Sequence, residues 1–114
     1  MLPRVNRLPS PLIRKIVSNG RRIHKGQVTL YIKNRENGIP RFAIIVPLSV
    51  DKRATVRIRI KRQIRETIRA LLPHIDQHYD IVLRTNGSVN KDDTITRTLI
   101  HETLVAAGVL KNSS

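Results

Sequence analysis

The spacing of apolar residues along the chain predicts an alternation of helices and strands. Apolar positions recur at helical spacing over residues 12–17, after two prolines that suit a helix start, so a short helix is expected before Asn19-Gly20. Val28–Lys33 and Phe42–Val46 are rich in β-branched and apolar residues and predict two strands, joined by the turn-rich Asn34–Pro40. The nearly continuous apolar run of the second strand indicates a central strand that is covered on both faces.

A long helix is predicted from about Arg53 to Leu72, with Asp51 as its N-cap and Pro73 at its end. A further strand is expected over Tyr79–Thr85. On the long helix, the apolar residues share one arc of about 120°, which is expected to face the core: Val56, Ile60, Ile64, Ile68 and Leu71.

The last helix is expected to have Asp92 or Asp93 as its N-cap and to close at Gly108. Helix, strands, helix, strand and helix in this order are typical of an α+β fold, in which helices pack on one small sheet. Because 114 residues suit one core, residues 1–114 are predicted to form a single domain. Residues 1–11 are expected to be a flexible arm and residues 111–114 a polar tail.

Charge divides the chain into two unequal parts. The 22 Lys and Arg residues outnumber the 8 Asp and Glu residues, which gives a formal net charge of +14. The balance is +15 over residues 1–75 and −1 over residues 76–114, so the first part carries the whole electrostatic signal. A compact body with this much positive charge needs an anionic partner, and nucleic acid is the first candidate.

Composition also excludes several classes of protein. The absence of cysteine excludes a disulfide framework, a thiol nucleophile and cysteine-based metal sites. No apolar run approaches the roughly 20 residues of a membrane helix. Arginines and prolines interrupt residues 1–18, which excludes a signal peptide. A soluble, cytoplasmic protein is therefore expected.

The long helix is also expected to present a basic face. Ile58 falls in the middle of this face, and Glu66 is the one acidic residue near it. The pattern favours a docking surface for the phosphates of RNA. Two alternatives stay open: a solvated helix without a ligand, and a helix on an anionic membrane, which ranks below RNA because the helix has no Trp or Phe anchor. The basic residues opposite the apolar arc, or flanking that side, are Arg59, Lys61, Arg62, Arg65 and Arg69.

Constellations for catalysis or metal binding are scarce. His74 and His78 have the i, i+4 spacing of metal ligands, but Pro73 breaks a helix there and no third ligand is evident. A solvated loop is therefore favoured, and no metal site is predicted. His24 lies among basic residues, where contact with phosphate is favoured over acid–base chemistry. The basic region has too few carboxylates to hold divalent metal for a protein nuclease, so no catalytic residue is assigned.

One stretch of the chain resembles a known family. Arg41–Val46, followed by Val50–Arg69, is similar to the signature region of the protein subunit of bacterial ribonuclease P. In that family a strand precedes a helix that reads roughly A-x-x-R-N-R-x-K-R-x-x-R-E. The similarity extends to Gly20–Gly26 and Tyr79–Leu83, and it covers nearly the whole chain. The positions that match the helix motif are Ala54, Arg57, Arg59, Lys61, Arg62, Arg65 and Glu66.

The resemblance implies an α+β fold of element order αβββαβα, like the second domain of ribosomal protein S5. That fold has a left-handed β-α-β crossover and would add a strand near Arg22–Val28. The resemblance also implies a protein that binds a catalytic RNA, one to one, and assists it in the endonucleolytic removal of the 5′ leader from precursor tRNA. The RNA would carry the chemistry, with Mg²⁺ bound through the RNA and not at a protein-only site. The alternative is a structural, ribosomal-type RNA-binding protein with no role in cleavage.

The resemblance assigns residues of this chain to two binding surfaces. The helix is implied to face the catalytic RNA, and a cleft between this helix and the sheet is implied to hold the leader. The implied RNA-binding residues are Lys52, Arg53, Arg57, Arg59, Lys61, Arg62, Arg65 and Arg69. The implied residues of the leader cleft are Ile13, Val17, Tyr31 and Phe42.

The sequence departs from the family pattern at several positions. Ile58 stands where the family has Asn, and Pro47-Leu48-Ser49 replaces a stretch usually written S-K-K. Ile13 and Val17 occupy helix positions that are typically aromatic, which removes stacking surface for the bases of the leader. Tyr31 is left as either the stacking residue of the cleft or a strand tyrosine that fills the surface.

Overall fold

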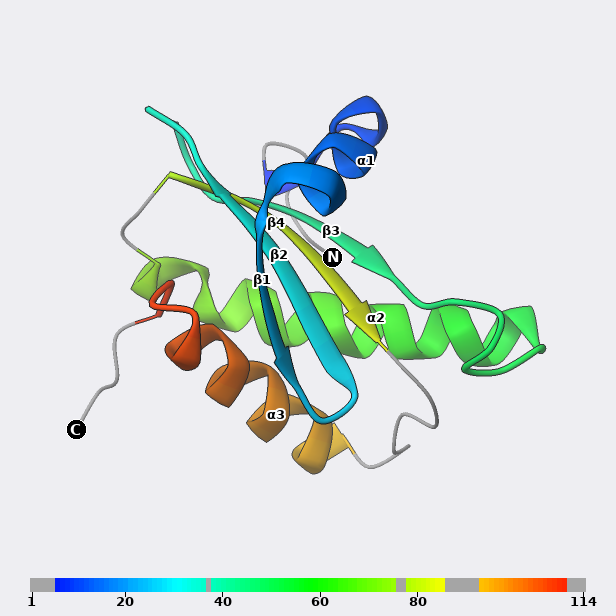
Figure 1. The fold of residues 1–114 in the computed structure, drawn as a ribbon. Helices are drawn as coiled ribbons and strands as arrows, with labels where there is room; N and C mark the ends of the chain where they lie inside the picture. Colours follow the sequence, from blue (N-terminus) through cyan, green and yellow to red (C-terminus); the bar gives the residue numbers. More distant parts are fainter. Residues whose placement is uncertain (1–5, 37, 76–77, 86–92, 111–114) are drawn as a thin grey trace.

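The computed structural model describes residues 6–36, 38–75, 78–85 and 93–110, with the side chains of the last segment described from Arg97 onward. The element order is αβββαβα, which confirms the order expected from the family resemblance (Figure 1). The elements are α1 (Ser10–Asn19), β1 (Arg21–Lys25), β2 (Val28–Asn34), β3 (Arg41–Ile45), α2 (Ala54–Leu71), the 3-10 turn η2 (Leu72–His74), β4 (Tyr79–Thr85) and α3 (Asp93–Ala106).

The strands form one four-stranded sheet in the order β1-β2-β4-β3. The β1/β2 and β2/β4 pairs are antiparallel, and the β3/β4 pair is parallel. The prediction of a central strand at Phe42–Val46 is therefore wrong, because β3 lies next to β4 alone and β4 separates it from β2. The apolar run reflects burial on both faces, with Phe42 packed on one side and Ala43 and Ile45 on the other. An edge strand can be covered in this way too, so composition could not distinguish the two positions.

The outer edge of β3 contacts the segment that precedes α1. Arg7 forms a parallel bridge with Phe42, and the N–H of Leu8 donates a 2.8 Å hydrogen bond to the Phe42 carbonyl. Asn6 donates a 2.8 Å side-chain hydrogen bond to the backbone of the β2–β3 connection. The expected flexible arm is thus wrong for residues 6–11: they pack on the sheet or start α1, because the buried Leu8 anchors them. Residues 1–5 and 111–114 lie outside the described residues.

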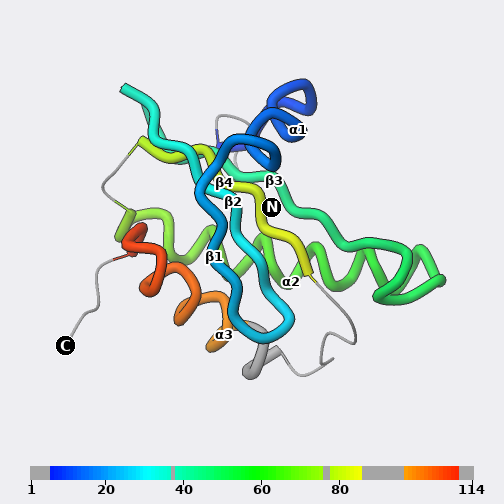
Figure 2. The backbone as a smooth tube through the Cα atoms, viewed as in Figure 1, coloured from blue at the N-terminus to red at the C-terminus, as the bar shows by residue number. Residues whose placement is uncertain are grey.

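Two features implied by the resemblance are present. The parallel strands β3 and β4 are connected through α2, which lies behind the sheet in Figure 1. In Figure 1 both strands point down the page, β3 lies to the right of β4, and α2 is behind them. When this view is turned in its plane so that the strands point up, the chain passes from β3 on the left, behind the sheet through α2, to β4 on the right. The crossover is therefore left-handed, against the general preference. The additional strand is β1, which ends at Lys25. Gly26, with a positive φ of 56°, then turns the chain into β2 (Figure 2).

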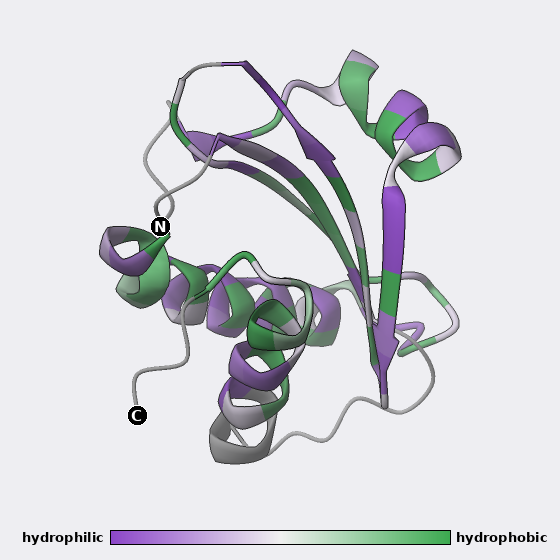
Figure 3. Ribbon diagram, turned by 60° about the vertical axis from the view of Figure 1, so that its left-hand side comes forward, coloured by the Kyte–Doolittle hydropathy of each residue, from purple (hydrophilic) through white to green (hydrophobic). Residues whose placement is uncertain are grey.

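Alternation along the strands gives the sheet two different faces. Leu30 and Ile32 of β2 point toward α2 and α3, whereas Tyr31 between them points toward α1. Apolar positions line the sheet and the helix faces turned toward it (Figure 3). The apolar arc predicted for the long helix is confirmed as the core face, with Val56 and Leu71 only partly buried. The larger core includes Val28, Leu30, Ile32, Phe42, Ile60, Ile64, Ile68, Ile81, Leu83, Ile100 and Leu104.

The start of α2 differs from the prediction in its cap. The helix begins at Ala54 with Arg53 as the N-cap residue, so the assignment of Asp51 as N-cap is wrong by two positions. The Asp51 carboxylate instead accepts a 2.8 Å hydrogen bond from the Arg53 N–H and two more, of 3.1 and 3.0 Å, from its guanidinium. Asp51 therefore fixes the turn that leads into the helix.

The C-terminal end of the closing helix was predicted correctly. At its start Asp93 is the first helical residue and not the N-cap, and Asp92, the other candidate for the cap, lies outside the described residues. Gly108 follows the last turn with φ +77°, a conformation that glycine adopts without strain. The N–H of Val109 then donates a 3.1 Å hydrogen bond to the Leu104 carbonyl, which closes the helix as expected.

Candidate nucleic-acid interface

The outer face of α2 is cationic. Among the residues that the structure describes, the guanidinium groups of Arg59, Arg62 and Arg65 have no hydrogen-bond or ion-pair partner. Like charges one turn apart repel by about 0.2–0.5 kcal/mol per pair, and an anionic ligand relieves this repulsion. This cationic face comprises the exposed Arg59, Arg62 and Arg69 and the partly buried Lys61 and Arg65.

The space between α2 and the sheet is filled by the core. Ile60, Ile64 and Ile68 of α2 pack there against β2, β3 and β4. The expected cleft between this helix and the sheet is therefore wrong, because the apolar arc that makes α2 amphipathic is buried against the strands.

Three of the four residues assigned to the cleft come together on the other face of the sheet. Ile13 and Val17 of α1 and Tyr31 of β2 pack around the same buried cluster of Leu8, Ile16 and Val82. All three are partly exposed. The candidate leader-binding surface thus lies on the α1 side of the sheet, opposite α2 (Figure 1).

Phe42, the fourth cleft residue, does not belong to this surface. Its side chain is 2% exposed and lies in the larger core, on the face of the sheet that α2 and α3 cover. Its neighbour Ala43 points toward α1 instead. The assignment of Phe42 to the leader cleft is therefore wrong, because successive side chains of a strand point to opposite faces.

The strand register adds cations to the α1 side of the sheet that the sequence alone did not assign there. Tyr31 is paired with Arg22 on β1 and with Val82 on β4, so these three side chains share the α1 face. In the next row of that face, Thr29 is paired with the exposed Arg84, and its hydroxyl lies 2.8 Å from the ring of His24. Strands far apart in the sequence pair to form this row. The sequence therefore indicates only which residues of each strand share a face, by their alternation, and not which residues of the other strands lie beside them.

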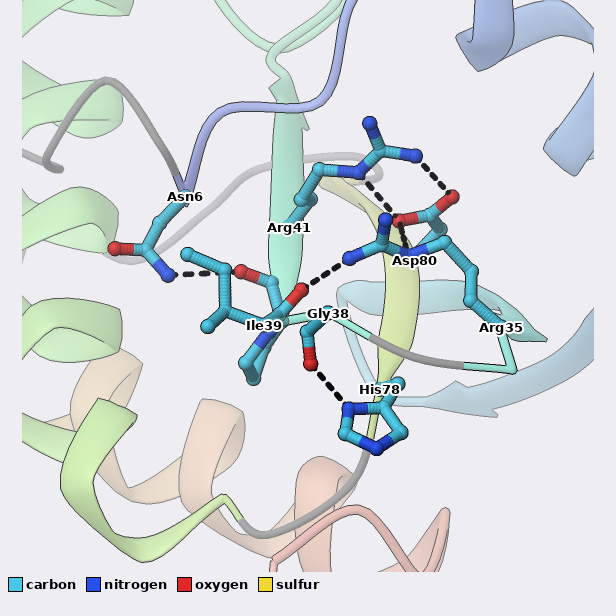
Figure 4. A network of polar contacts seen from close by, with 8 residues as sticks. Asn6, Arg35, Gly38, Ile39, Arg41, His78 and Asp80 are labelled. Carbon is cyan, nitrogen blue, oxygen red and sulfur yellow. Dashed lines mark hydrogen bonds and ion pairs between the residues drawn. The ribbon is translucent and has the colours of Figure 1, made fainter.

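A buried ion-pair network lies at one end of the same face (Figure 4). Asp80 of β4 is 4% exposed and accepts hydrogen bonds of 2.9 and 2.8 Å from the Arg41 guanidinium. The hydrogen bond to Asp80 raises the pKa of Arg41 above its usual value. Arg35 Nε lies 3.0 Å from the same carboxylate, as an ion pair without hydrogen-bond geometry, and Arg35 also donates to the Ile39 carbonyl. The network ties the β2–β3 connection to the central strand.

Comparison with known proteins identifies the family. The family model described as Ribonuclease P matches residues 2–105. The chain belongs to the ribonuclease P protein family. A ribonuclease P protein component from Rippkaea orientalis is 34% identical over 96 residues, which cover 79% of this chain and 76% of that protein.

Solved ribonuclease P proteins share this fold. The protein from Staphylococcus aureus superimposes with a TM-score of 0.83 at 22% identity, over 93% of this chain and 98% of that chain. The protein from Thermotoga maritima gives a TM-score of 0.72 at 21% identity, over 84% of this chain and 92% of that chain. The α+β architecture expected from the sequence is confirmed.

Not all of the arginines in the ribonuclease P signature helix are equally available. Arg57 Nη1 donates hydrogen bonds of 2.8 and 2.9 Å to the carbonyls of Asp51 and Lys52, and Arg53 is paired with the Asp51 carboxylate. These two arginines therefore hold the β3–α2 turn against the helix. Lys52 is exposed beside them. Contact of any of the eight assigned residues with RNA stays a prediction.

Two histidines of this ribonuclease P protein contact polar groups of the fold: His24 the Thr29 hydroxyl and His78 a backbone carbonyl. His74 is exposed in η2, and the ring of His78 contacts the Gly38 carbonyl. Within the described segments, no three His, Asp or Glu side chains are grouped as metal ligands. None of the helices described is both long enough and apolar enough to cross a membrane.

Proposed function

We propose that this chain is the RNA-binding protein subunit of a bacterial ribonuclease P and acts in the cytoplasm. In this role it assists a catalytic RNA in removing the 5′ leader from precursor tRNA. The observation that carries the proposal is the cationic face of α2, whose Arg59, Arg62 and Arg65 have no partner among the described residues. Such a face fits an RNA backbone, and the chain belongs to a family whose members include ribonuclease P protein components.

The α2 face is proposed to bind the catalytic RNA, in a complex of one protein with one RNA. Each arginine that contacts a phosphate releases condensed counterions, which favours binding most strongly at low salt. The opposite face of the helix is buried in the core, so the cations are carried on a rigid support. This rigidity lowers the entropy lost when the side chains engage the RNA.

The α1 side of the sheet is proposed to bind the single-stranded leader. Tyr31 offers a ring on which a base can stack, and Arg22 and Arg84 lie on the same face to meet phosphates. Ile13 and Val17 supply an apolar wall from α1. Two surfaces on opposite sides of the sheet would let the protein hold the catalytic RNA and the leader at the same time.

The hydrolytic step is proposed to belong to the RNA, with Mg²⁺ bound through the RNA. The described residues fit this division, because the buried carboxylate of Asp80 is already engaged by Arg35 and Arg41. A carboxylate neutralised by two guanidinium groups is a poor ligand for a divalent cation. The part of the protein is to bind and orient the RNAs.

The proposal is tested by cleavage of precursor tRNA at low Mg²⁺, with the cognate ribonuclease P RNA alone and with the purified protein added. We expect the protein to accelerate release of the leader. If the protein binds the RNA tightly but leaves the rate of cleavage unchanged, the alternative holds: a structural RNA-binding protein with no role in cleavage.

The salt dependence of RNA binding separates the arginines of α2. Replacing Arg62 and Arg65 together by alanine is expected to flatten the slope of log K against log salt by up to about 2, because two phosphate contacts are lost. The control is Arg57→Ala, whose guanidinium is bonded within the fold. It is expected to lower affinity without changing the slope. If the double variant keeps the salt slope of the wild type, as Arg57→Ala is expected to do, Arg62 and Arg65 do not contact the RNA.

Tyr31 is expected to contribute to binding of the leader. Tyr31→Ala should weaken the holoenzyme's affinity for precursor tRNA by about 1–3 kcal/mol, the usual value of stacking one base on an aromatic ring. Tyr31→Phe keeps the ring and should keep the affinity. Binding is measured in parallel for mature tRNA, which has no leader. An equal loss for both RNAs would show that Tyr31 only fills the surface.

A further inference from the structure

The first two turns of α2 present an apolar side chain outward, next to the cationic face. Ile58 is 54% exposed, and Ala54 and Thr55, one turn before it, are exposed as well. Three large apolar residues are exposed in the described part of the chain, and Ile58 is the one that lies on α2. Arg62 follows Ile58 by one turn and Arg65 by two. The uncharged surface of Ala54, Thr55 and Ile58 is therefore adjacent to these two arginines on the same side of the helix.

Nothing in the free protein favours isoleucine at this position. The core face of α2 lies on the opposite side of the helix, where Ile60, Ile64 and Ile68 are buried. As a β-branched residue, isoleucine is also a weaker helix former than alanine, lysine or arginine. A role in stability therefore does not account for an apolar side chain amid the arginines.

The chemistry of this surface selects the part of the RNA that it fits. A phosphate needs hydrogen-bond donors, and the isoleucine side chain has none. The face of a nucleobase is apolar and can cover such a side chain, but in a regular duplex that face is stacked against its neighbours. Bases in loops, bulges and ends can be splayed out and covered by protein side chains. Cations on the next turns would meet the phosphates beside such a base.

We propose that the first two turns of α2 bind an unstacked nucleobase of the RNA partner on Ile58, while Arg62 and Arg65 bind neighbouring phosphates. This inference rests on the proposed function, because the RNA partner is the one assigned above. The inference goes beyond the proposed function because it names the kind of RNA segment that α2 recognises. This segment is an irregular, single-stranded position and not a continuous duplex.

The test measures binding of the purified protein to its cognate ribonuclease P RNA at several salt concentrations. Ile58→Ala is expected to lower the affinity about tenfold, or about 1.4 kcal/mol, at every salt concentration, with an unchanged salt slope. The slope stays because no phosphate contact is lost. Arg62→Ala, in contrast, should reduce the slope by about 1.

Leu48→Ala is the matched control. Leu48 lies in the β3–α2 connection, is 66% exposed and loses the same number of carbon atoms on truncation. It is expected to leave affinity unchanged. Ile58→Phe gives the base an aromatic ring and should keep or raise the affinity. Chemical probing should find an unpaired base that the wild-type protein protects and Ile58→Ala does not.

The outcomes separate this inference from the proposed function. If the wild-type protein fails to bind the RNA or to accelerate cleavage, the proposed function fails. If the wild type binds the RNA and Ile58→Ala binds it equally well, the inference is overturned, because the Ile58 side chain then contributes nothing to RNA binding. A changed salt slope for Ile58→Ala would also overturn it, because the side chain would then act through the placement of phosphate contacts.

Discussion

Replacing Ile64 by alanine is expected to lower the free energy of unfolding by about 3–4 kcal/mol. Ile64 is 0% exposed and packs in the core between α2 and the sheet. Truncation removes most of its side chain and leaves a cavity that the surrounding elements can fill only in part. Urea unfolding followed by circular dichroism gives the change. Since many domains have only 5–15 kcal/mol in total, this variant should unfold at a much lower urea concentration.

The same substitution at Ile58 is the matched control, because both residues lie on α2 and only their faces differ. Ile58 is largely exposed, and alanine is the better helix former, so Ile58→Ala is expected to stay within about 0.5 kcal/mol of the wild type. A loss comparable to that of Ile64→Ala would show that Ile58 is packed in the free protein. That result would also contradict the assignment of its side chain to RNA binding.

Replacing Asp80 by alanine is expected to cost about 3 kcal/mol of unfolding free energy. The substitution leaves Arg35 and Arg41, both partly buried, without their shared carboxylate. Removing one partner of a buried ion pair is costly because the remaining charges have lost water and gain nothing in return. Chemical unfolding measures the effect, and Asp80→Asn, which keeps the shape but not the charge, is expected to fall between the wild type and Asp80→Ala.

An exposed arginine–aspartate pair on the same chain gives the comparison. Arg53 is paired with Asp51 through two hydrogen bonds, but its side chain is open to solvent. Arg53→Ala is therefore expected to leave the denaturation midpoint unchanged, because water competes for an exposed pair. If the two variants were equally destabilised, burial would not be the source of the Asp80 effect.

The two faces of α2 separate stability from binding. The inner isoleucines stabilise the fold, and the outer Arg59, Arg62 and Arg65 lack partners among the described residues and are available to an anion. Arg57 and Arg53 are exceptions, because their guanidinium groups hold the turn before the helix. Variants on the inner face should therefore change unfolding, and variants such as Arg62→Ala should change RNA affinity with little effect on unfolding.

Local periodicity predicted much of this fold correctly. The spacing of Ile60, Ile64 and Ile68 determines the core face of α2, because every third or fourth residue of a helix lies on one side. The same spacing places Arg62 and Arg65 on the outside. The strands β2 and β4 and the positive φ of Gly108 were likewise encoded within a few consecutive residues. The motif in α2 pointed to the family for the same reason, since its residues are contiguous.

The tertiary structure decided what depends on partners far away in the chain. The edge position of β3, the left hand of the crossover and the position of Tyr31 on the α1 side of the sheet follow from how strands pair across the sheet. Phe42 and Tyr31 are both apolar strand residues, but only the register shows that they point to opposite faces. Asp80 likewise finds Arg41 39 positions away. A sequence alone therefore determined which side chains are buried or charged along each element, and only the packed chain determined which of them meet.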